Sequence, residues 1–304
     1  MGISFFTALL FAIHPVQVET VCWISASKIV LSTFFYLSAL ICYIQYMRNS
    51  KWQYLLASVV SSILAMGCKE QSVIIVPCLL LFDWMLFKRN MRSLKVYIEK
   101  VYYLIPAIAI FIVTLVANKN TGEEIIGYTI VDRFIFLCYS SFKYLLISAI
   151  PFKLSYLYPF PFQVGEKIPM ALWIYPFVIL FIGYVIYLNR RKPLLVFCTL
   201  FFILHLLPVL HVIPLPRYVV AADRYLYIPY IAFAIGLSIL SYHLYERQRK
   251  WILYAGFLYC SYLCVYTAGY APAWKNSDTL KEHFKEVLKK RETNLSINFK
   301  HEKQ

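Results

Sequence analysis

The sequence predicts an all-α polytopic membrane protein, and three observations support this fold class. The chain of 304 residues is 61% hydrophobic and 15% charged, whereas soluble domains are about 45–50% apolar and about 25% charged. Apolar runs recur along the chain at lengths near the roughly 17–25 residues that a spanning helix requires. Lysine and arginine collect in short clusters between these runs, which is the pattern that orients helices in a membrane.

The basic clusters predict which loops face the cytoplasm. The formal net charge is +15, but the clusters alternate with apolar runs, so we expect no nucleic-acid partner. We assign the intervening stretches 14–28, 67–71, 118–169 and 213–224 to the opposite side. Thirteen cations lie in the four stretches assigned to the cytoplasm: Arg48 and Lys51; Lys88, Arg89, Arg92, Lys95 and Lys100; Arg190, Arg191 and Lys192; Arg247, Arg249 and Lys250.

A parity argument then identifies one apolar segment that does not span. Three segments (101–117, 130–150 and 170–188) separate two cytoplasmic loops, yet an even number of crossings must do so. Segment 130–150 contains Asp132, Arg133 and Lys143, so we expect an interfacial or re-entrant helix on the non-cytoplasmic side. A bundle of about nine spans follows, at 1–13, 29–46, 52–66, 71–87, 101–117, 170–188, 193–212, 225–244 and 251–270.

The remaining segments complete the organisation. Residues 1–270 form the membrane domain, with an external loop at 151–169, and residues 271–304 form an external amphipathic tail. Ser277 or Thr279 is expected to cap the tail helix, because Thr279 and Glu282 match a capping box. The first span is short: 13 helical residues cover only about 20 Å of a hydrocarbon core about 30 Å thick.

Candidate site residues all fall on the predicted outer side, and each has a structural alternative. His14 and Glu19 are either a helix stop beside a solvated carboxylate or acid–base groups for a polar substrate. Lys69 and Glu70 either punctuate a hairpin or hold a lipid phosphate and orient a sugar hydroxyl. The last group consists of Arg217, Asp223 and Arg224.

In that last group, Asp223 is either an N-cap or a site residue. Arg224, together with Arg217, has the planar fork suited to phosphate, which we favour over snorkelling. Asp83 is interpreted as a capped interfacial carboxylate near the cytoplasmic end of its span. The aromatic stretch 156–162 is interpreted as a membrane-interface belt. We predict no metal site and no disulfide framework, since no metal-ligand spacing or C-x-x-C motif is present.

Four segments resemble a known family. LLFAIHPVQVETVCWISASKIVLSTFFYLSALICYIQY (9–46), AMGCKEQSVIIVPCLLLFDW (65–84), YLLISAIPFKLSYLYPFPF (144–162) and AADRYLYIPYIAF (221–233) are similar, in order, to the membrane domain of the transmembrane and tetratricopeptide-repeat proteins and their bacterial relatives. AWKNSDTL (273–280) resembles the junction into the repeats of that family. Relative to its members, the chain is expected to lack N-terminal spans, an acidic first external loop and the repeat array.

The resemblance implies a function. The family has the GT-C glycosyltransferase fold, and its animal members are O-mannosyltransferases that use a polyprenyl-phosphate-linked sugar. His14, Glu19, Lys69, Glu70, Asp223 and Arg224 would then line the donor cavity.

The expected activity is transfer of a sugar from the lipid-linked donor to a protein or glycan hydroxyl on the non-cytoplasmic face. Glu19 and Glu70 are the candidate catalytic acids, and His14, Lys69, Arg217, Asp223 and Arg224 bind substrate or the donor phosphate. No cofactor is expected. The expected partners are membrane lipid, the donor, the acceptor and a protein that supplies missing spans. The resemblance favours a bacterial plasma membrane over the endoplasmic reticulum. Two other functions remain open: a noncatalytic remnant or subunit of a split glycosyltransferase, and a transporter or lipid-handling protein.

Overall fold

The computed structural model describes residues 2–117, 128–155, 158–211 and 219–282. Within these ranges the chain is helical, with an isolated antiparallel bridge between Tyr158 and Ala221 and no strand, which confirms the all-α prediction. The longer helices are α1 (Gly2–Ile13), α3 (Ser27–Asn49), α4 (Trp52–Cys68), α5 (Ile75–Met85), α6 (Leu94–Ala117), α7 (Ile130–Ala149), α8 (Ile174–Leu188), α9 (Pro193–Leu206), α10 (Pro229–Arg247) and α11 (Arg249–Tyr270).

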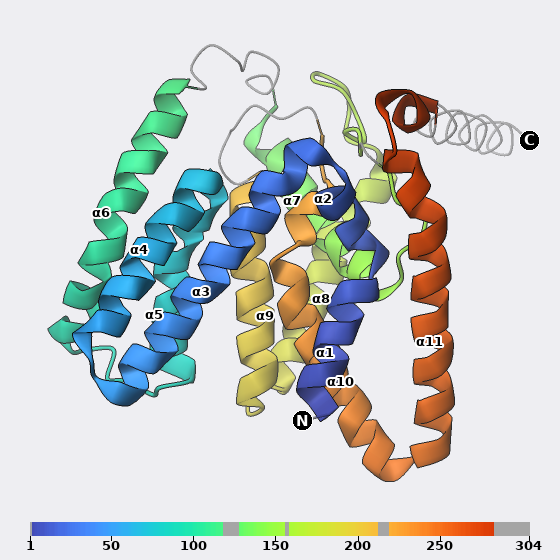
Figure 1. The fold of residues 1–304 in the computed structure, drawn as a ribbon. Coiled ribbons are helices and arrows are strands. Elements are labelled where there is room, and N and C mark those ends of the chain that lie inside the picture. Colours follow the sequence, from blue (N-terminus) through green and yellow to red (C-terminus); the bar gives the residue numbers. More distant parts are fainter. Residues whose placement is uncertain (1, 118–127, 156–157, 212–218, 283–304) are drawn as a thin grey trace, which may run out of the picture.

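Most of these helices run back and forth between two ends of the molecule. The chain starts at the lower end in Figure 1, and α1, α4, α6, α9 and α11 lead upward while α3, α5, α8 and α10 return. α3 packs along α4, and α10 packs against both α1 and α9. The turns that carry the four cationic clusters all lie at the lower end. This arrangement agrees with the grouping of the basic residues on one side.

Four described helical segments are long and apolar enough to cross a membrane: Ile24–Asn49, Leu94–Ala117, Met170–Leu188 and Arg249–Trp274. A fifth candidate is Gly2–Ile13 with Pro15–Cys22, bent by 55°, and this bend confirms that His14 and Pro15 end the first helix. Trp52–Cys68 and Pro193–Val209 are apolar but shorter. The predicted spans at 71–87 and 225–244 are not among these candidates. α5 has only 11 residues, and α10 ends in a polar stretch that includes His243 and Glu246.

Large apolar side chains cover much of the outside of the bundle. α8 buries none of its own residues, and Phe177, Leu180, Phe257 and Leu258 are each at least 67% exposed. A patch this large is unfavourable in water but matches a lipid environment. The structure therefore supports a membrane protein.

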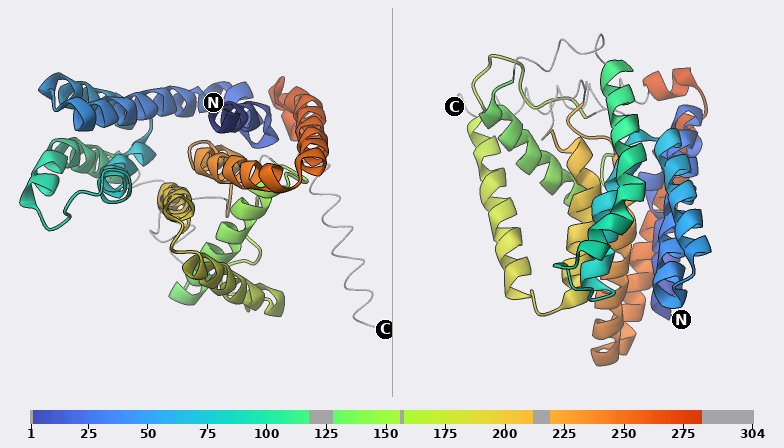
Figure 2. Two further views of the ribbon diagram at one scale, coloured as in Figure 1. Left: turned by 90° about the horizontal axis from the view of Figure 1, so that it is seen from below. Right: turned by 90° about the vertical axis from the view of Figure 1, so that its left-hand side faces the viewer.

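Helix α7 lies obliquely in the upper half of the bundle rather than along the other helices (Figure 2). Thr129 and Asp132 form a capping box at its start, so Asp132 begins the helix instead of interrupting it. The sequence of α7 also predicts a polar side of Arg133, Tyr139, Ser140, Lys143 and Tyr144. This side does not face water throughout, since Ser140 and Tyr144 are buried. The Tyr144 hydroxyl accepts a hydrogen bond from the backbone N–H of Ala222 at 3.2 Å. The polar side of α7 thus supports a loop inside the bundle.

The capping residue of the tail helix differs from the prediction. Neither Ser277 nor Thr279 is the N-cap. The side-chain oxygen of Asn276 accepts from the backbone N–H groups of Asp278 and Thr279, at 3.1 and 2.8 Å. The Thr279 hydroxyl instead accepts from the Asn276 N–H at 3.2 Å. Leu280 packs against the core, and the predicted stripe at Phe284, Val287 and Leu288 lies outside the described residues.

The alternating helices generate a topology prediction. A reporter attached at Gln304 should be active on the non-cytoplasmic side, because the lower-end turns carry the cations and α11 runs to the upper end. The matched control is the same reporter inserted after Asn49, which should be active in the cytoplasm. Reporter activity and protease protection in intact cells or spheroplasts measure both. A cytoplasmic signal at Gln304 would contradict the nine-span arrangement.

Candidate functional site

Two segments distant in sequence meet through Glu19 and Arg224. Glu19 lies in the short helix α2 (Val18–Cys22) and Arg224 in the 3-10 helix η6 (Asp223–Leu226). Arg224 Nη1 donates to Glu19 Oε1 at 2.5 Å, and the Arg224 backbone N–H donates to Glu19 Oε2 at 2.9 Å. Glu19 is fully buried, so it is not the solvated carboxylate considered from the sequence. Both of its oxygens hold Arg224 in place.

The neighbouring Asp223 is also buried but has a different environment. Tyr158 donates its hydroxyl hydrogen to Asp223 Oδ1 at 2.8 Å, and Oδ2 has no partner among the described residues. The N-cap of η6 is Ala222, so the N-cap interpretation of Asp223 is wrong. Burial raises the pKa of Asp223 well above its usual value, and the negative charge of Glu19 raises it further.

The aromatic stretch after α7 packs inward. Tyr158 and Phe162 are only 2% and 5% exposed, and Phe162 stacks on Phe136 of α7 with ring centroids 4.9 Å apart. The Lys143 ammonium lies 3.9 Å from the centroid of the Tyr158 ring. For these described residues the membrane-belt interpretation is wrong, because their rings fill the space between α7 and η6.

His14 is enclosed at the bend after α1. Its Nδ1 accepts a hydrogen bond from the Val16 backbone N–H at 3.3 Å, and its ring lies 4.3 Å from the ring of Tyr230. The side chain is 0% exposed. His14 therefore supports the start of the segment that carries Glu19, and a bound substrate would reach it only through a rearrangement.

Lys69 and Glu70 lie between α4 and the 3-10 helix η3 (Glu70–Ile74). Lys69 Nζ is 2.9 Å from Glu70 Oε1, and their side chains are 15% and 45% exposed. Glu70 is therefore accessible, whereas Glu19 is not. Of the two candidate catalytic acids, an acceptor hydroxyl can reach only Glu70 in this conformation.

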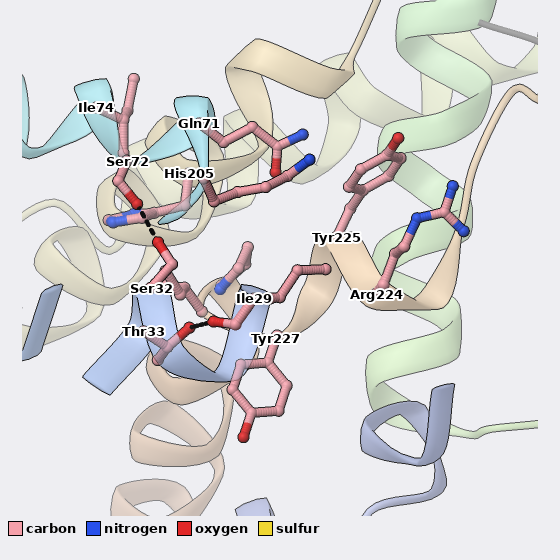
Figure 3. A pocket seen from close by; sticks show the side chains of 13 residues that line it. Ile29, Ser32, Thr33, Gln71, Ser72, Ile74, His205, Arg224, Tyr225 and Tyr227 are labelled. Atoms are coloured by element: carbon pink, nitrogen blue, oxygen red, sulfur yellow. Dashed lines mark hydrogen bonds between the residues drawn. The ribbon is translucent and has the colours of Figure 1, made fainter. Parts of the chain in front are cut away.

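Lys69 and Arg224 line one pocket (Figure 3). The cavity volume is about 30 Å³, and since roughly 10–15 Å³ holds one water molecule, it admits about two groups of that size. Figure 3 shows the Arg224 guanidinium pointing away from Ser32 and Ser72. The full lining comprises Ile29, Ser32, Thr33, Lys69, Gln71, Ser72, Ile74, His205, Arg224, Tyr225, Tyr227, Ile228 and Pro229.

The pocket joins some of the predicted site residues and not others. Lys69 and Arg224 line it directly, and Glu19 reaches it through Arg224. His14, Glu70 and Asp223 are not part of the lining, and Arg217 lies outside the described residues. Across the described ranges, no group of three or more His, Cys, Asp or Glu side chains could hold a metal ion.

Sequence reasoning missed the polar floor of this pocket. Ser32 and Thr33 on α3, Ser72 on η3 and His205 on α9 were not singled out. A signal was present in α3, where Ile29, Ser32, Thr33 and Tyr36 share one helical face by their spacing. Small hydroxyl residues are common packing residues in membrane helices, so this spacing alone does not separate a pocket from an interface.

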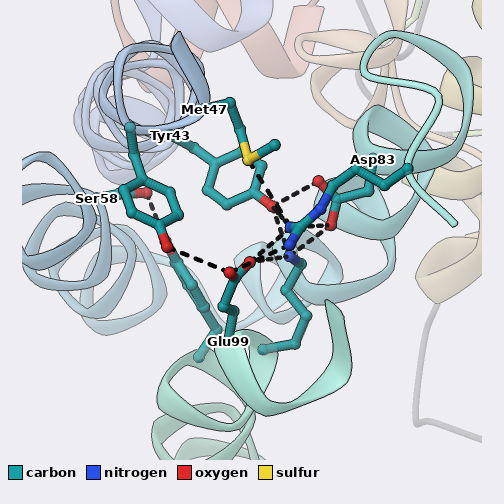
Figure 4. Close-up of polar contacts among 9 residues, drawn as sticks. Tyr43, Met47, Ser58, Asp83 and Glu99 are labelled. Atoms are coloured by element: carbon teal, nitrogen blue, oxygen red, sulfur yellow. Dashed lines mark hydrogen bonds and ion pairs between the residues drawn. The ribbon is translucent and has the colours of Figure 1, made fainter. Parts of the chain in front are cut away.

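A second buried charged cluster was also missed (Figure 4). Lys100 Nζ lies 2.6 Å from Asp83 Oδ2 and 2.5 Å from the Tyr43 hydroxyl. Arg89 donates twice to Glu99, at 2.6 and 3.2 Å. The Tyr43 hydroxyl donates to Asp83 Oδ1 at 2.6 Å. Two acids and two bases thus pair within one cluster.

This cluster corrects two predictions. Asp83 is 0% exposed and is not a capped interfacial carboxylate. Lys100, which the sequence placed in a cytoplasmic loop, lies in α6 and is 3% exposed. Their partners come from α3, α5, α6 and the turn before α6, so the cluster connects these helices. It lies apart from the pocket and shares no residue with it.

Comparison with protein-family models, with curated proteins and with solved structures finds no match to this chain. The geometry of the site therefore carries the functional inference.

The environment of Asp223 predicts a pH-dependent stability difference. A carboxyl whose pKa is raised on folding favours the folded state below its unfolded pKa of 3.8, and this contribution is lost as the pH rises through the folded pKa. Asp223→Asn keeps an acceptor for Tyr158 but cannot ionise. Near pH 4 we expect the variant and the wild type to have similar melting temperatures. At pH 8 we expect the variant to melt at least about 2–4 °C above the wild type. Thermal unfolding in detergent measures this. Asp278→Asn, at an exposed position, is the control, and a difference that does not change with pH would contradict the assignment.

The Asp83 cluster predicts a large loss of stability on removal of one partner. Lys100→Met should destabilise the protein by about 3–5 kcal/mol, because Asp83 would lose its closest cation while buried. The double variant Asp83→Asn with Lys100→Met should recover most of the loss, since no buried charge is left unpaired. Chemical denaturation in detergent measures both. Lys95→Met, at an exposed position on the same helix, is the control. Equal stability of Lys100→Met and Lys95→Met would contradict the pairing.

Proposed function

We propose that this protein is a membrane glycosyltransferase of the GT-C type that takes a sugar from a polyprenyl-phosphate-linked donor. The observation that carries the proposal is the convergence of Lys69 and Arg224 on one pocket. The two cations come from segments that join different pairs of helices. Two cations at one pocket within a lipid-facing bundle suit an anionic group attached to a lipid.

Arg224 is held in an orientation suited to phosphate. Glu19 contacts Nη1 and the backbone N–H of Arg224, so part of the guanidinium fork is occupied. Arginine has five N–H donors, and those that Glu19 and the Tyr225 side chain do not engage are available to a ligand. In this proposal Glu19 is a positioning residue, and Lys69 supplies a second positive charge.

The proposed reaction is a direct displacement at the anomeric carbon. Glu70 accepts the proton of the acceptor hydroxyl while the acceptor oxygen forms a bond to the anomeric carbon. The bond from that carbon to the lipid phosphate breaks, and the departing phosphate keeps the electron pair. Arg224 and Lys69 stabilise the charge on the departing phosphate, and the configuration at the anomeric carbon is inverted.

Glu70 is proposed as the base because of its accessibility. Its side chain is 45% exposed. Burial raises the pKa of Glu70. The charge and hydrogen bond of Lys69, a backbone hydrogen bond and the charge of Lys28 together outweigh burial, so the net shift is downward. The carboxylate is therefore ionised at neutral pH and able to accept a proton. The acceptor is a protein or glycan hydroxyl at the end of the bundle that carries η3 and η6.

We further propose the nine-span arrangement, with α7 non-spanning and the tail outside the cytoplasm, in a bacterial plasma membrane. The alternation of helices in Figure 1 and the cations at the lower end support it. The shorter helices α5 and α9 pack beside each other and gain support from their neighbours, so they need not match the full bilayer thickness themselves.

A second candidate is a noncatalytic remnant, or a subunit that needs a partner to complete the site. One observation favours it. Glu19 and Asp223 are both buried, which leaves Glu70 as the accessible acid among the described candidates. If a partner supplies the base, donor binding should persist in this chain without transfer.

The experiment measures lipid binding and turnover with the full chain in proteoliposomes. Arg224→Ala should weaken binding of polyprenyl phosphate about 10- to 100-fold, because charged hydrogen bonds contribute about 1.5–3 kcal/mol each. Arg224→Lys should recover only part of this loss, since lysine lacks the planar fork. Arg190→Ala, at an exposed position away from the pocket, is the control. Unchanged binding by Arg224→Ala would contradict the proposal.

Turnover then separates the two acids. Glu70→Gln should lower the release of polyprenyl phosphate from polyprenyl-phosphate mannose at least about 100-fold in the presence of an acceptor peptide rich in Ser and Thr, with donor affinity retained. Glu19→Gln should instead weaken donor binding. Equal turnover of Glu70→Gln and the wild type would remove Glu70 as the base.

A further inference from the structure

Ser32, Thr33 and Ser72 form the floor of the pocket, and each of their hydroxyl hydrogens is donated to another group of the protein. The Ser32 hydroxyl donates to the Ala65 carbonyl at 2.9 Å. Ser72 Oγ lies 2.7 Å from Ser32 Oγ, and since the Ser32 hydrogen is used, Ser72 is the donor of that bond. The Thr33 hydroxyl donates to the Ile29 carbonyl at 2.8 Å. These three side chains therefore offer lone pairs to the pocket and no hydrogen.

His205 likewise has no hydrogen free for a ligand in the pocket. Its Nδ1 lies 2.8 Å from the Phe201 carbonyl, which can only accept, so Nδ1 carries the hydrogen. Its Nε2 lies 2.8 Å from the Tyr36 hydroxyl and shares a hydrogen bond with it. Both ring nitrogens are thus engaged within the protein, so the imidazole adds no hydrogen-bond donor to the floor.

Donors and acceptors are separated by depth. Ser32, Thr33 and Ser72 are 2%, 4% and 3% exposed, whereas the side chains of Lys69 and Arg224 are 15% and 19% exposed. The cations form the rim of the pocket, and the acceptors form its floor. Figure 3 shows the Ser32–Ser72 pair and the Thr33–Ile29 contact on the floor, with the Arg224 guanidinium to one side.

A floor that only accepts hydrogen bonds selects its ligand. Phosphate oxygens and the floor hydroxyl oxygens are both hydrogen-bond acceptors. Neither would supply the other with a hydrogen, and unpaired acceptors are costly in a buried site. An ammonium group would find no carboxylate among these floor residues and would be a buried unpaired charge. A neutral hydroxyl can donate one hydrogen bond without either cost, and the cavity of about 30 Å³ admits a hydroxyl or hydroxymethyl group but not a sugar ring.

We propose that the Ser32–Thr33–Ser72 floor binds a hydroxyl of the donor sugar while Lys69 and Arg224 bind the phosphate. This inference rests on the proposed function and adds a residue-level determinant of sugar recognition. Thr33 is the best residue to test, because valine has nearly the same shape and removes only the hydroxyl. The sugar ring then lies at the mouth of the pocket beside Tyr225, which also lines it.

The test compares two probes, polyprenyl phosphate and polyprenyl-phosphate mannose, with the full chain in proteoliposomes. Thr33→Val should weaken binding of the mannosylated lipid about three- to ten-fold, the range for loss of one hydrogen bond, and leave binding of polyprenyl phosphate unchanged. Thr33→Ser should retain wild-type affinity for both. The matched control is Thr114→Val, on a helix outside the pocket. The Thr114 hydroxyl donates to the Ile110 carbonyl four residues earlier, as the Thr33 hydroxyl does to Ile29, so both variants lose the same kind of hydrogen bond.

The outcomes separate this inference from the proposed function. Failure of the wild type to bind either lipid would overturn the proposed function and this inference with it. Binding of both lipids with no selective effect of Thr33→Val would overturn only the floor assignment. Equal weakening of both lipids by Thr33→Val would also overturn it, because the hydroxyl would then act on the phosphate or on the fold. Melting temperatures of Thr33→Val and Thr114→Val show whether the fold is affected.

Discussion

The ion pair between Glu19 and Arg224 is the contact on which the candidate site depends. It joins residues 205 positions apart and brings the bend after α1 against the start of α10. Without it, the guanidinium would have no fixed position at the edge of the pocket. Because Glu19 is fully buried, its charge is compatible with the fold only while Arg224 remains paired with it. The same contact thus stabilises the fold and positions the cation.

The rule that polar groups inside a bilayer must find partners within the protein explains much of the remaining structure. The Asp83–Lys100 and Arg89–Glu99 pairs, together with the hydrogen bond from Tyr43 to Asp83, connect α3, α5 and α6 at one end of the bundle. Hydroxyl groups of Ser32, Thr33 and Ser72 donate inward for the same reason. These side chains of the floor then present only acceptors to the cavity. The need to pair polar groups inside the membrane thus gives the pocket a preference for a ligand hydroxyl.

The pocket and the charged cluster differ in how completely their polar groups are used. The Asp83 cluster is paired on all sides and serves to hold helices together. At the pocket, the exposed part of Lys69 and the remaining donors of Arg224 leave capacity for a ligand, and the accessible Glu70 is the chain neighbour of Lys69. This contrast is why the pocket, rather than the larger charged cluster, is proposed as the functional site.

The sequence by itself determined the helical class, the lipid environment, the break at His14 and the grouping of cations on one side. These properties follow from local composition and periodicity, which each segment carries independently of the rest. It also identified Lys69, Glu19 and Arg224 as residues of interest. Only the tertiary structure decided that Glu19 is buried against Arg224, that Asp83 pairs with Lys100, and that Tyr158 packs inward. Such contacts join residues far apart in the chain, and their partners are set by how the helices pack.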